Sequence, residues 1–438
     1  MMDWEKLLST WRTPFENQEP GPSSRQMFRS QFESDYDRIV YSQPFRRLAR
    51  KTQVHPLTPN DHVHNRLTHS IEVASVGRSF ARRLSKFLSD EGLLPQDRSG
   101  DDLGWILMAA CAAHDIGNPP YGHAGESAIR EWSASHEEVV FPNDLNVSDG
   151  VRQDVLLFEG NAQGFRISAR NDNPLIGYLR LTYATLGAMV KYPWDACDSR
   201  ASKLGKHNCF SSEKEIFRDV FAHMGLVDAA GEYFRHPLSF LSEAADDICY
   251  RVVDLEDAAE LRIVPDHRIR KIYGRLLGSA QPEHKPLSQI RGEVIERLID
   301  ETWKVFVGNY DEIMSGQRSA DLKSGLDAQL VSALEEVQHV YDEIFAEISK
   351  VAVELGAYKA LGRILKAVCN ATSQLARKQD LAELQFISLR CLDLAWPKHH
   401  VEQNQKQPYE WWLHQVLDYV SALSDNMARQ ISREIEGT

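Results

Sequence analysis

Cysteine is scarce in this chain of 438 residues, which contains six cysteines and no C-x-x-C pair. This scarcity argues against a disulfide-stabilised scaffold and a cysteine-type zinc site, and it is typical of a reducing cytosol. Long apolar runs are also missing, because the longest, residues 105–113, is far shorter than the ~18 residues of a membrane span. The N-terminal segment MMDWEKLLSTW has no basic stretch followed by an apolar one. We therefore expect no signal peptide, no membrane partner and a cytoplasmic location.

Positive charge is in deficit, since 50 Lys and Arg residues face 63 Asp and Glu residues, for a formal net charge of −13. This balance argues against a general nucleic-acid coat and against a membrane-surface protein. An anionic ligand must therefore meet a local group of basic side chains. Apolar residues make up 42% and charged residues 26% of the chain, as in folded globular proteins, which excludes a fibrous or largely disordered chain.

Proline is almost absent from the last third of the chain, where Pro397 and Pro408 are the only prolines after Pro286. Helical periodicity recurs along the sequence, for example over residues 67–80 and 413–427, whereas alternating strand patterns are scarce. We expect an all-α fold. Its expected organisation is a large helical domain over residues 1–290 and a C-terminal helical region over residues 291–438 packed on it.

Ionisable residues directly follow the longest apolar run, which ends at His114 and Asp115. Such groups at the end of a buried helix are costly unless they are paired or bind a metal. Imidazole and carboxylate suit a divalent cation, but two neighbouring ligands need others from elsewhere in the chain. His69 lies on an amphipathic helical pattern upstream, and Asp246 and Asp247 lie on another apolar pattern downstream.

Longer motifs surround these residues. They are QPFRRLARKTQV (43–54), NRLTHSIEV (65–73), HDIGNPPYGHAGE (114–126), FEGNAQGFR (158–166), EAADDICYRVVDLED (243–257) and DYVSALSD (418–425). In these motifs and their order the chain resembles the deoxyguanosinetriphosphate triphosphohydrolases, the dGTPase family of the HD phosphohydrolase superfamily. The resemblance covers roughly residues 30–265 as well as the last motif. It implies an HD-domain helical fold with additional C-terminal helices.

The resemblance implies a divalent metal ion, Mn²⁺ or Mg²⁺ before other first-row metals. Its implied ligands are His69, His114, Asp115 and Asp246. The choice of Asp246 over Asp247 follows from helical register, because Asp246, Tyr250 and Asp254 are spaced four residues apart and project from one face. Asp247 would point about 100° away. The family order of metal Asp, Tyr and substrate-contacting Asp fits this register.

The residues His123 and Glu126 are three apart, so they share a face of a helix or tight turn. The resemblance implies that they are the catalytic pair, acting in proton transfer and in positioning the water beside the phosphates. Without the HD motif, a turn histidine bonded to the backbone would be the preferred interpretation of His123.

The resemblance also implies the substrate-binding residues. Arg66 and Lys191 would bind the negatively charged phosphates, and Tyr192 would contact the phosphates and the sugar. Gln53 and Asp254 would bind the 3′-hydroxyl. Tyr250 would lie against the face of the sugar, where its ring would clash with a 2′-hydroxyl. The implied set is Arg46, Gln53, Arg66, Asn161, Lys191, Tyr192, Tyr250 and Asp254. For the basic run that contains Arg46, a solvated helix face is the alternative, and we prefer it for Arg47 and Arg50.

The implied reaction is hydrolysis of a deoxynucleoside triphosphate (dNTP) to deoxynucleoside and tripolyphosphate, by attack at the α-phosphorus. One alternative is an HD phosphohydrolase acting on another nucleotide, which the FEGNAQGFR motif and the Lys191-Tyr192 pair disfavour. Another is a nucleotide-binding regulator without turnover, which the intact ligand set disfavours. The resemblance further implies a homo-oligomer, often a hexamer, and a nucleotide or single-stranded DNA effector, although no residue pattern shows either.

Overall fold

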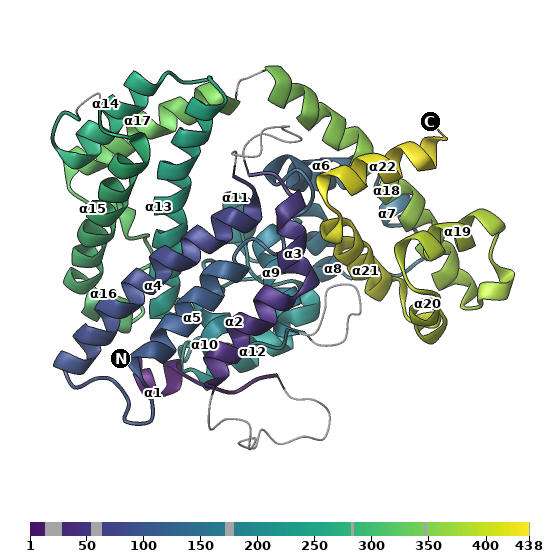
Figure 1. The fold of residues 1–438 in the computed structure, drawn as a ribbon. Coiled ribbons are helices and arrows are strands. Elements are labelled where there is room, and N and C mark those ends of the chain that lie inside the picture. The colour runs from purple at the N-terminus through teal and green to yellow at the C-terminus, as the bar shows by residue number, and fades with distance from the viewer. Residues whose placement is uncertain (14–28, 54–63, 171–178, 282–283, 346–347, 438) are drawn as a thin grey trace.

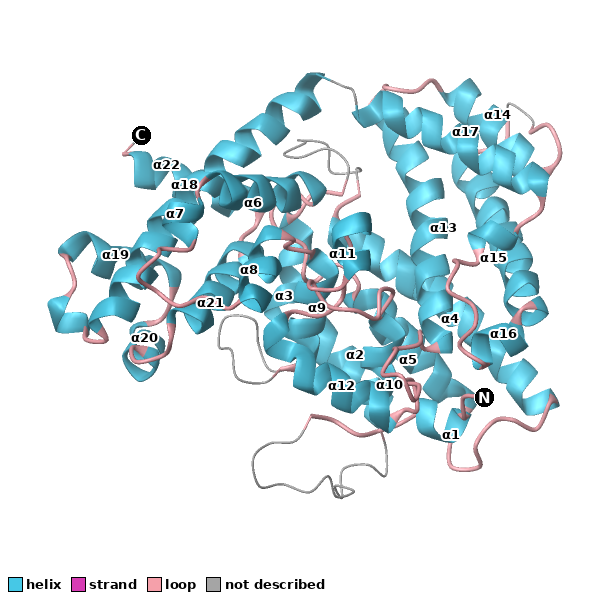
Figure 2. Cartoon of the chain, turned by 180° about the vertical axis from the view of Figure 1, so that it is seen from behind, coloured by secondary structure: helices cyan, strands magenta, loops and turns pink. Residues whose placement is uncertain are grey.

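The computed structural model describes residues 1–13, 29–53, 64–170, 179–281, 284–345 and 348–437. Over these ranges the chain forms α-helices, short 3₁₀ helices and isolated β-bridges, and no strand (Figures 1 and 2). The expected all-α fold is confirmed. Among the helices described, none combines the length and the apolar character needed to cross a bilayer.

The first hydrophobic core surrounds α5 (Gly100–Ala113), whose buried run of small apolar residues packs against α2, α4, α10 and α13. A Cβ at Gly77 of α4 would lie 2.7 Å from Sγ of Cys111, so α4 approaches α5 as closely as glycine permits. The other helices of this core are α1 (Trp4–Leu7), α2 (Gln31–Tyr41), α3 (Gln43–Arg47), α4 (Arg66–Asp90), α10 (Tyr183–Met189), α12 (Lys214–His223), α13 (Pro237–Glu260), α14 (Asp266–Leu277), α15 (Leu287–Gly308), α16 (Tyr310–Met314) and α17 (Ala328–Phe345).

The second core surrounds α18 (Ile348–Lys378), the longest helix described, which packs against α6, α19, α21 and α22. Figure 1 shows α14, α15 and α17 at one end of the molecule and α19 to α22 at the other. The other helices of the second core are α6 (His123–Ser135), α7 (Glu137–Val140), α8 (Asp149–Leu156), α19 (Phe386–Ala395), α20 (Lys398–Asn404), α21 (Tyr409–Ala422) and α22 (Asp425–Glu436).

Helix α9 (Gly160–Ala169) joins the two cores, because its Ala162 packs in the second core and its Phe165 in the first. Each core draws residues from both sides of residue 290. The cores therefore do not test the expected boundary there, which stays a prediction. The remaining described helices are α11 (Ser199–Leu204) and the 3₁₀ helices η2 (Leu48–Arg50), η3 (Ser211–Glu213), η4 (Lys323–Gly325) and η5 (Leu381–Glu383).

The structure corrects the single helical pattern expected over residues 413–427. Helix α21 ends at Ala422, and Ser424 begins α22 as its N-cap, with Oγ accepting a hydrogen bond from the Met427 N–H at 3.3 Å. A serine N-cap ends one helix and starts the next in a new direction. The apolar spacing continues across Ser424, so the pattern does not show the break. The break places Asp425 at the first position of α22, close to the cavity described below.

Candidate active site

A cavity of about 460 Å³ lies where the two cores meet, and elements of both supply its walls. Twelve of the fourteen predicted site residues line it, and only Arg46 and Asp254 do not. Those lining it are Gln53, Arg66, His69, His114, Asp115, His123, Glu126, Asn161, Lys191, Tyr192, Asp246 and Tyr250.

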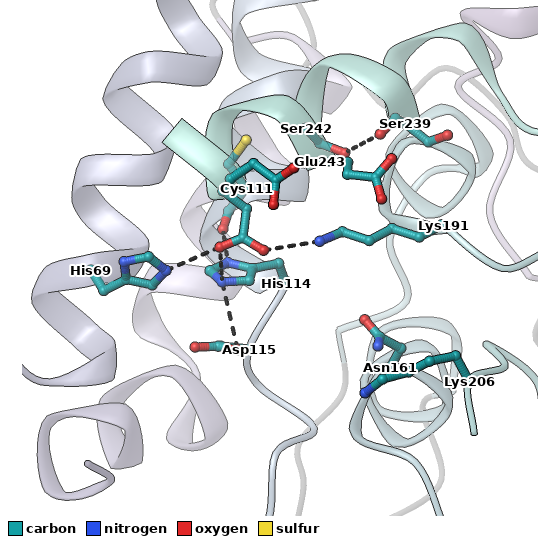
Figure 3. A network of polar contacts seen from close by, with 12 residues as sticks. His69, Cys111, His114, Asp115, Asn161, Lys191, Lys206, Ser239, Ser242 and Glu243 are labelled. Carbon is teal, nitrogen blue, oxygen red and sulfur yellow. Dashed lines mark hydrogen bonds and ion pairs between the residues drawn. The ribbon is translucent and has the colours of Figure 1, made fainter. Parts of the chain in front are cut away.

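The predicted metal ligands converge in this cavity. His69 lies in the first turn of α4, His114 ends α5, and one ligand atom from each lies within 4.8 Å of the others and of an Asp115 oxygen. On α13, Oδ1 of Asp246 lies 3.1 Å from Nε2 of His69 and 3.4 Å from Nε2 of His114. Figure 3 shows His69 and His114 converging from their helices, with Lys191 approaching from the other side. Two imidazoles and two carboxylates in this arrangement fit a divalent cation.

Helix ends orient these ligands. Nδ1 of His114 lies 2.7 Å from the Cys111 carbonyl oxygen, which can only accept a hydrogen bond. Nδ1 therefore carries the proton, and the lone pair of Nε2 faces the cavity, as a metal ligand requires. Of the two neighbouring aspartates, Asp246 faces the histidines, whereas Oδ2 of Asp247 lies 3.7 Å from Nζ of Lys323. The assignment of Asp246 as a ligand remains a prediction that this geometry favours.

Cations keep the buried carboxylates ionised. Burial raises the pKa of Asp246, but the Lys191 ammonium and a hydrogen bond from His69 outweigh burial and hold that pKa well below its usual range. For Asp115, burial likewise raises the pKa, and the Arg66 guanidinium reverses the shift so that the pKa is lowered. Nη1 of Arg66 donates to Oδ2 of Asp115 at 2.6 Å, and Nζ of Lys191 lies 2.9 Å from Oδ2 of Asp246. The cluster therefore presents two carboxylate anions at neutral pH.

The predicted catalytic pair lies at the N-terminus of α6. Tyr121 and Gly122 both have positive φ, 65° and 58°, and the sharp turn they make sets His123 as the first residue of the helix. Nδ1 of His123 lies 3.0 Å from Oε2 of Glu126, whose Oε1 accepts the Gly160 N–H at 2.8 Å. Burial raises the pKa of Glu126, but His123 and nearby Lys206 outweigh it and lower that pKa. An ionised Glu126 can therefore orient the ring of His123.

Lys206 is a cavity residue that sequence reasoning missed. Its Nζ lies 2.5 Å from Oε1 of Glu159, which also accepts from Nδ2 of Asn161 at 3.1 Å, and 3.8 Å from Oε2 of Glu126. The residue follows α11 in a segment without helical periodicity, and no motif contains it. The fold brings it beside Asn161, as Figure 3 shows.

The residues predicted to contact the sugar divide into two groups. Gln53 and Tyr250 line the cavity, and the ring of Tyr250 stacks on Tyr341 with centroids 4.7 Å apart and planes 5° apart. Asp254 is buried outside the cavity lining, where burial raises its pKa to about 7. Arg46 is exposed on α3 and lines no part of the cavity. Their binding roles remain predictions.

Comparisons with known proteins show the family of this chain. The HD domain model matches residues 66–152, which include His69, His114 and Asp115. A deoxyguanosinetriphosphate triphosphohydrolase-like protein of Pseudomonas aeruginosa (strain LESB58) is 37% identical, covering 100% of this chain and 99% of the relative. A protein so named from Synechocystis sp. is 33% identical with the same coverage. The deoxyguanosinetriphosphate triphosphohydrolase of Yersinia enterocolitica is 31% identical, covering 90% of this chain and 91% of the relative. The resemblance is thus confirmed, and the chain belongs to the deoxyguanosinetriphosphate triphosphohydrolase family.

Proposed function

We propose that this protein is a metal-dependent triphosphohydrolase that converts a dNTP and water to a deoxynucleoside and tripolyphosphate. One observation carries the proposal: the His and Asp cluster shares a single cavity with the His123–Glu126 pair and with three cationic side chains. The names of the relatives support a dNTP as the substrate. A regulator without turnover would not need the His123–Glu126 pair beside the cluster.

We propose His69, His114, Asp115 and Asp246 as the metal ligands, because their donor atoms converge and their carboxylates are ionised. A divalent cation held there supplies Lewis-acid polarisation of the α-phosphate and lowers the pKa of water. Mn²⁺ and Mg²⁺ are the proposed ions, since oxygen and imidazole donors suit both.

Cationic side chains in the cavity can balance the negative charge of the substrate. A triphosphate carries about four negative charges, and charge-assisted hydrogen bonds to Arg and Lys are the strong ones. Arg66, Lys191 and Lys206 line the cavity, although each already contacts a carboxylate there. Lys206 and Lys191 can turn toward phosphate oxygens without leaving their partners, because an ammonium group has three donors.

The proton balance assigns the role of His123. Attack of water on the α-phosphorus forms one P–O bond and breaks the bond to the 5′-oxygen, so water loses a proton and the 5′-oxygen gains one. His123 can hold and donate such a proton, because its side chain is 80% exposed toward solvent and its Nδ1 faces ionised Glu126. Glu126 orients the ring of His123.

The finer features of the proposal rest on the family resemblance alone. They are a homo-oligomer, a nucleotide or single-stranded DNA effector, and a cytoplasmic location. Native mass spectrometry with and without dNTP and oligodeoxynucleotide measures the first two directly.

Product analysis tests the proposed reaction. Purified protein is incubated with each of the four dNTPs in turn, with Mn²⁺ or Mg²⁺, and products are separated by anion exchange. Tripolyphosphate and deoxynucleoside in equal amounts are expected. Release of orthophosphate, or of pyrophosphate together with a deoxynucleoside monophosphate, would show that a different P–O bond is broken and would contradict the proposal. Hydrolysis of nucleoside monophosphates alone would favour the alternative phosphohydrolase.

A further inference from the structure

Both oxygens of Asp115 are held by neighbouring side chains. Oδ2 accepts a hydrogen bond from Nη1 of Arg66 at 2.6 Å, and Oδ1 accepts one from Nδ2 of Asn118. Each carboxylate oxygen keeps a further lone pair, so these contacts orient Asp115 without preventing it from ligating a cation. The direction in which Asp115 faces the cavity therefore depends on where Arg66 and Asn118 lie.

Arg66 is itself fixed by backbone on two sides. Its Nε donates to the Thr52 carbonyl oxygen at 3.0 Å. On the other side, a Cβ at Gly122 would lie 2.5 Å from Nη2 of Arg66, so the guanidinium rests directly against the Gly122 backbone. A shift of either Thr52 or Gly122 would move the guanidinium and, with it, Asp115.

Asp425, more than 300 positions from both segments, binds each of them. Its Oδ2 accepts from the N–H of Thr52 at 3.0 Å and from Oγ1 of Thr52 at 2.6 Å, while its Oδ1 accepts from the Tyr121 N–H at 2.9 Å. The hydroxyl of Tyr121 returns a hydrogen bond to the Asp425 carbonyl oxygen at 3.0 Å. Asp425 is buried and its partners are partly buried, so losing these bonds would leave buried oxygen atoms without donors, which costs free energy.

A second contact, made by Lys51, links the junction of α21 and α22 to Asn118. Nζ of the buried Lys51 donates to the carbonyl oxygens of Asn118, at 2.5 Å, and of Ser421, at 2.6 Å. The junction of α21 and α22 thus reaches both side chains that hold Asp115. It also reaches the positive-φ turn that precedes His123.

We propose that Asp425 is a positioning residue for the active site: through Thr52 and Tyr121 it fixes Arg66, the orientation of Asp115 and the turn before His123. The inference rests on the proposed function for its kinetic consequence and on the donor cluster for its effect on metal affinity. It makes the last helix of the chain part of the active-site framework, although no residue of α22 lines the cavity.

The test compares Asp425→Asn with Asp154→Asn in the full-length protein. Asp154 is a matched control, because it is also buried and also joins the C-terminal helices to the rest, through Ser211 N–H at 2.8 Å and His414 Nε2 at 2.9 Å, but it lies outside the cavity lining. Three quantities are measured for each variant: the Mn²⁺ dissociation constant by calorimetry on metal-free protein, kcat and KM for dNTP, and the melting temperature.

We expect Asp425→Asn to weaken Mn²⁺ binding and to lower kcat, each by roughly 10-fold, the lower end of the range for groups bonded directly to a ligand, because Asp425 acts through Thr52 and Arg66. KM should change less, because Asp246 and Glu159 hold Lys191 and Lys206, and Arg66 alone among the three proposed phosphate-binding cations depends on Asp425. Asp154→Asn should lower the melting temperature while Mn²⁺ affinity and kcat stay within threefold of wild type. If Asp425→Asn lowers only the melting temperature, Asp425 is a scaffold residue and the inference is overturned.

Two further outcomes are informative. If wild type releases no tripolyphosphate from any dNTP, the proposed function fails. The positioning role of Asp425 is tested separately by Mn²⁺ affinity, and an unchanged Mn²⁺ dissociation constant in Asp425→Asn would overturn it. If Asp425→Asn does not fold, Thr52→Val removes the shorter of the two bonds to Oδ2 and should give the same pattern of losses at smaller size. A Thr52→Val protein with wild-type Mn²⁺ affinity and kcat would contradict the inference.

Discussion

Nε2 of His69 lies 3.1 Å from Oδ1 of Asp246, although 177 positions separate the two residues in the chain. This contact joins α4 to α13, which pack on each other and on α5. The next residue, Asp247, turns instead toward Lys323. A difference of one position on α13 therefore decides which carboxylate faces the imidazoles.

Exchange of each aspartate for alanine measures this difference. Asp246→Ala removes an ionised group that faces both histidines, so metal affinity should fall by more than the roughly 10–100-fold that an orienting partner costs. Asp247→Ala should leave metal affinity within about threefold of wild type, because the substitution removes no proposed ligand. Calorimetric titration with Mn²⁺ gives both values. Loss of binding in Asp247→Ala alone would show that the register is assigned wrongly.

The sequence was sufficient for the parts of the site that lie on regular helices. The apolar run ending at His114 predicts the end of α5, and four-residue spacing predicts that Asp246 and Tyr250 share a face of α13. Both inferences depend only on local periodicity, which the helices preserve. The family motifs then grouped residues from separate helices that periodicity alone could not have joined.

Contacts made by loops and helix ends were beyond the reach of the sequence. Lys206 reaches the site through the packing of segments far apart in the chain, and no motif contains it. Asp425 ends the DYVSALSD motif, but the motif does not indicate that its carboxylate binds Thr52 and Tyr121. Arg46, predicted to bind substrate, is exposed on α3 and does not line the cavity, so its role stays a prediction. Local charge does not report which face of a short helix is turned inward.

Sugar discrimination is expected to depend on the Tyr250 ring, which lines the cavity and is supported by Tyr341 in a stacked pair. Tyr250→Ala should raise kcat/KM for GTP relative to dGTP by roughly 10-fold or more, the scale of one steric contact in a pocket. Tyr341→Phe keeps the supporting ring but removes the hydroxyl that donates to the Tyr250 carbonyl oxygen, so discrimination that persists in this variant shows that ring stacking is sufficient. Steady-state rates on both nucleotides give the ratio, and comparable kcat/KM for GTP and dGTP in wild type would refute this view of Tyr250.

Proton transfer by His123 can be separated from metal binding. His123→Ala should lower kcat by roughly 10²–10⁴-fold, the range for general acid–base groups, while metal content stays near that of wild type. Because the side chain is 80% exposed, its loss should hardly change the melting temperature. Measuring kcat, bound metal and melting temperature on one preparation decides the role. Activity that falls only as far as metal content does would make His123 a structural residue.

His64 connects α4 and α13 outside the proposed ligand set. Its Nδ1 lies 2.6 Å from Oδ1 of Asp257, and its Nε2 lies 3.2 Å from Oε1 of Glu72. Hydrogen bonds to Asp257 and Glu72 raise the pKa of His64 to about 10, against burial, which lowers it. The imidazole is therefore protonated in the folded protein at neutral pH and holds two carboxylates at once.

This shift predicts how the stability of the protein changes with pH. The pKa of His64 is about 10 in the folded chain and 6.5 without these contacts, so its contribution to the free energy of unfolding is complete below about pH 6.5. That contribution is lost as pH rises from 6.5 toward 10. The melting temperature of wild type should therefore exceed that of His64→Gln by roughly 2 °C or more at pH 6.5, and the difference should shrink toward pH 10.

Thermal unfolding followed by circular dichroism across this pH range measures the difference. His267→Gln serves as the control, because His267 is exposed on α14 and the substitution should leave the melting temperature unchanged at every pH. The pH at which the wild-type advantage begins to fall reports the pKa of His64 in the unfolded chain, and the pH at which the advantage disappears reports its pKa in the folded protein. The His64 ring lies between two carboxylates, and a neutral imidazole can donate a hydrogen bond to only one of them. We therefore expect the advantage to fall as His64 loses its charge. An advantage that stays constant from pH 6.5 to 10 would mean that His64 binds Asp257 and Glu72 equally well without its charge, and would contradict the prediction.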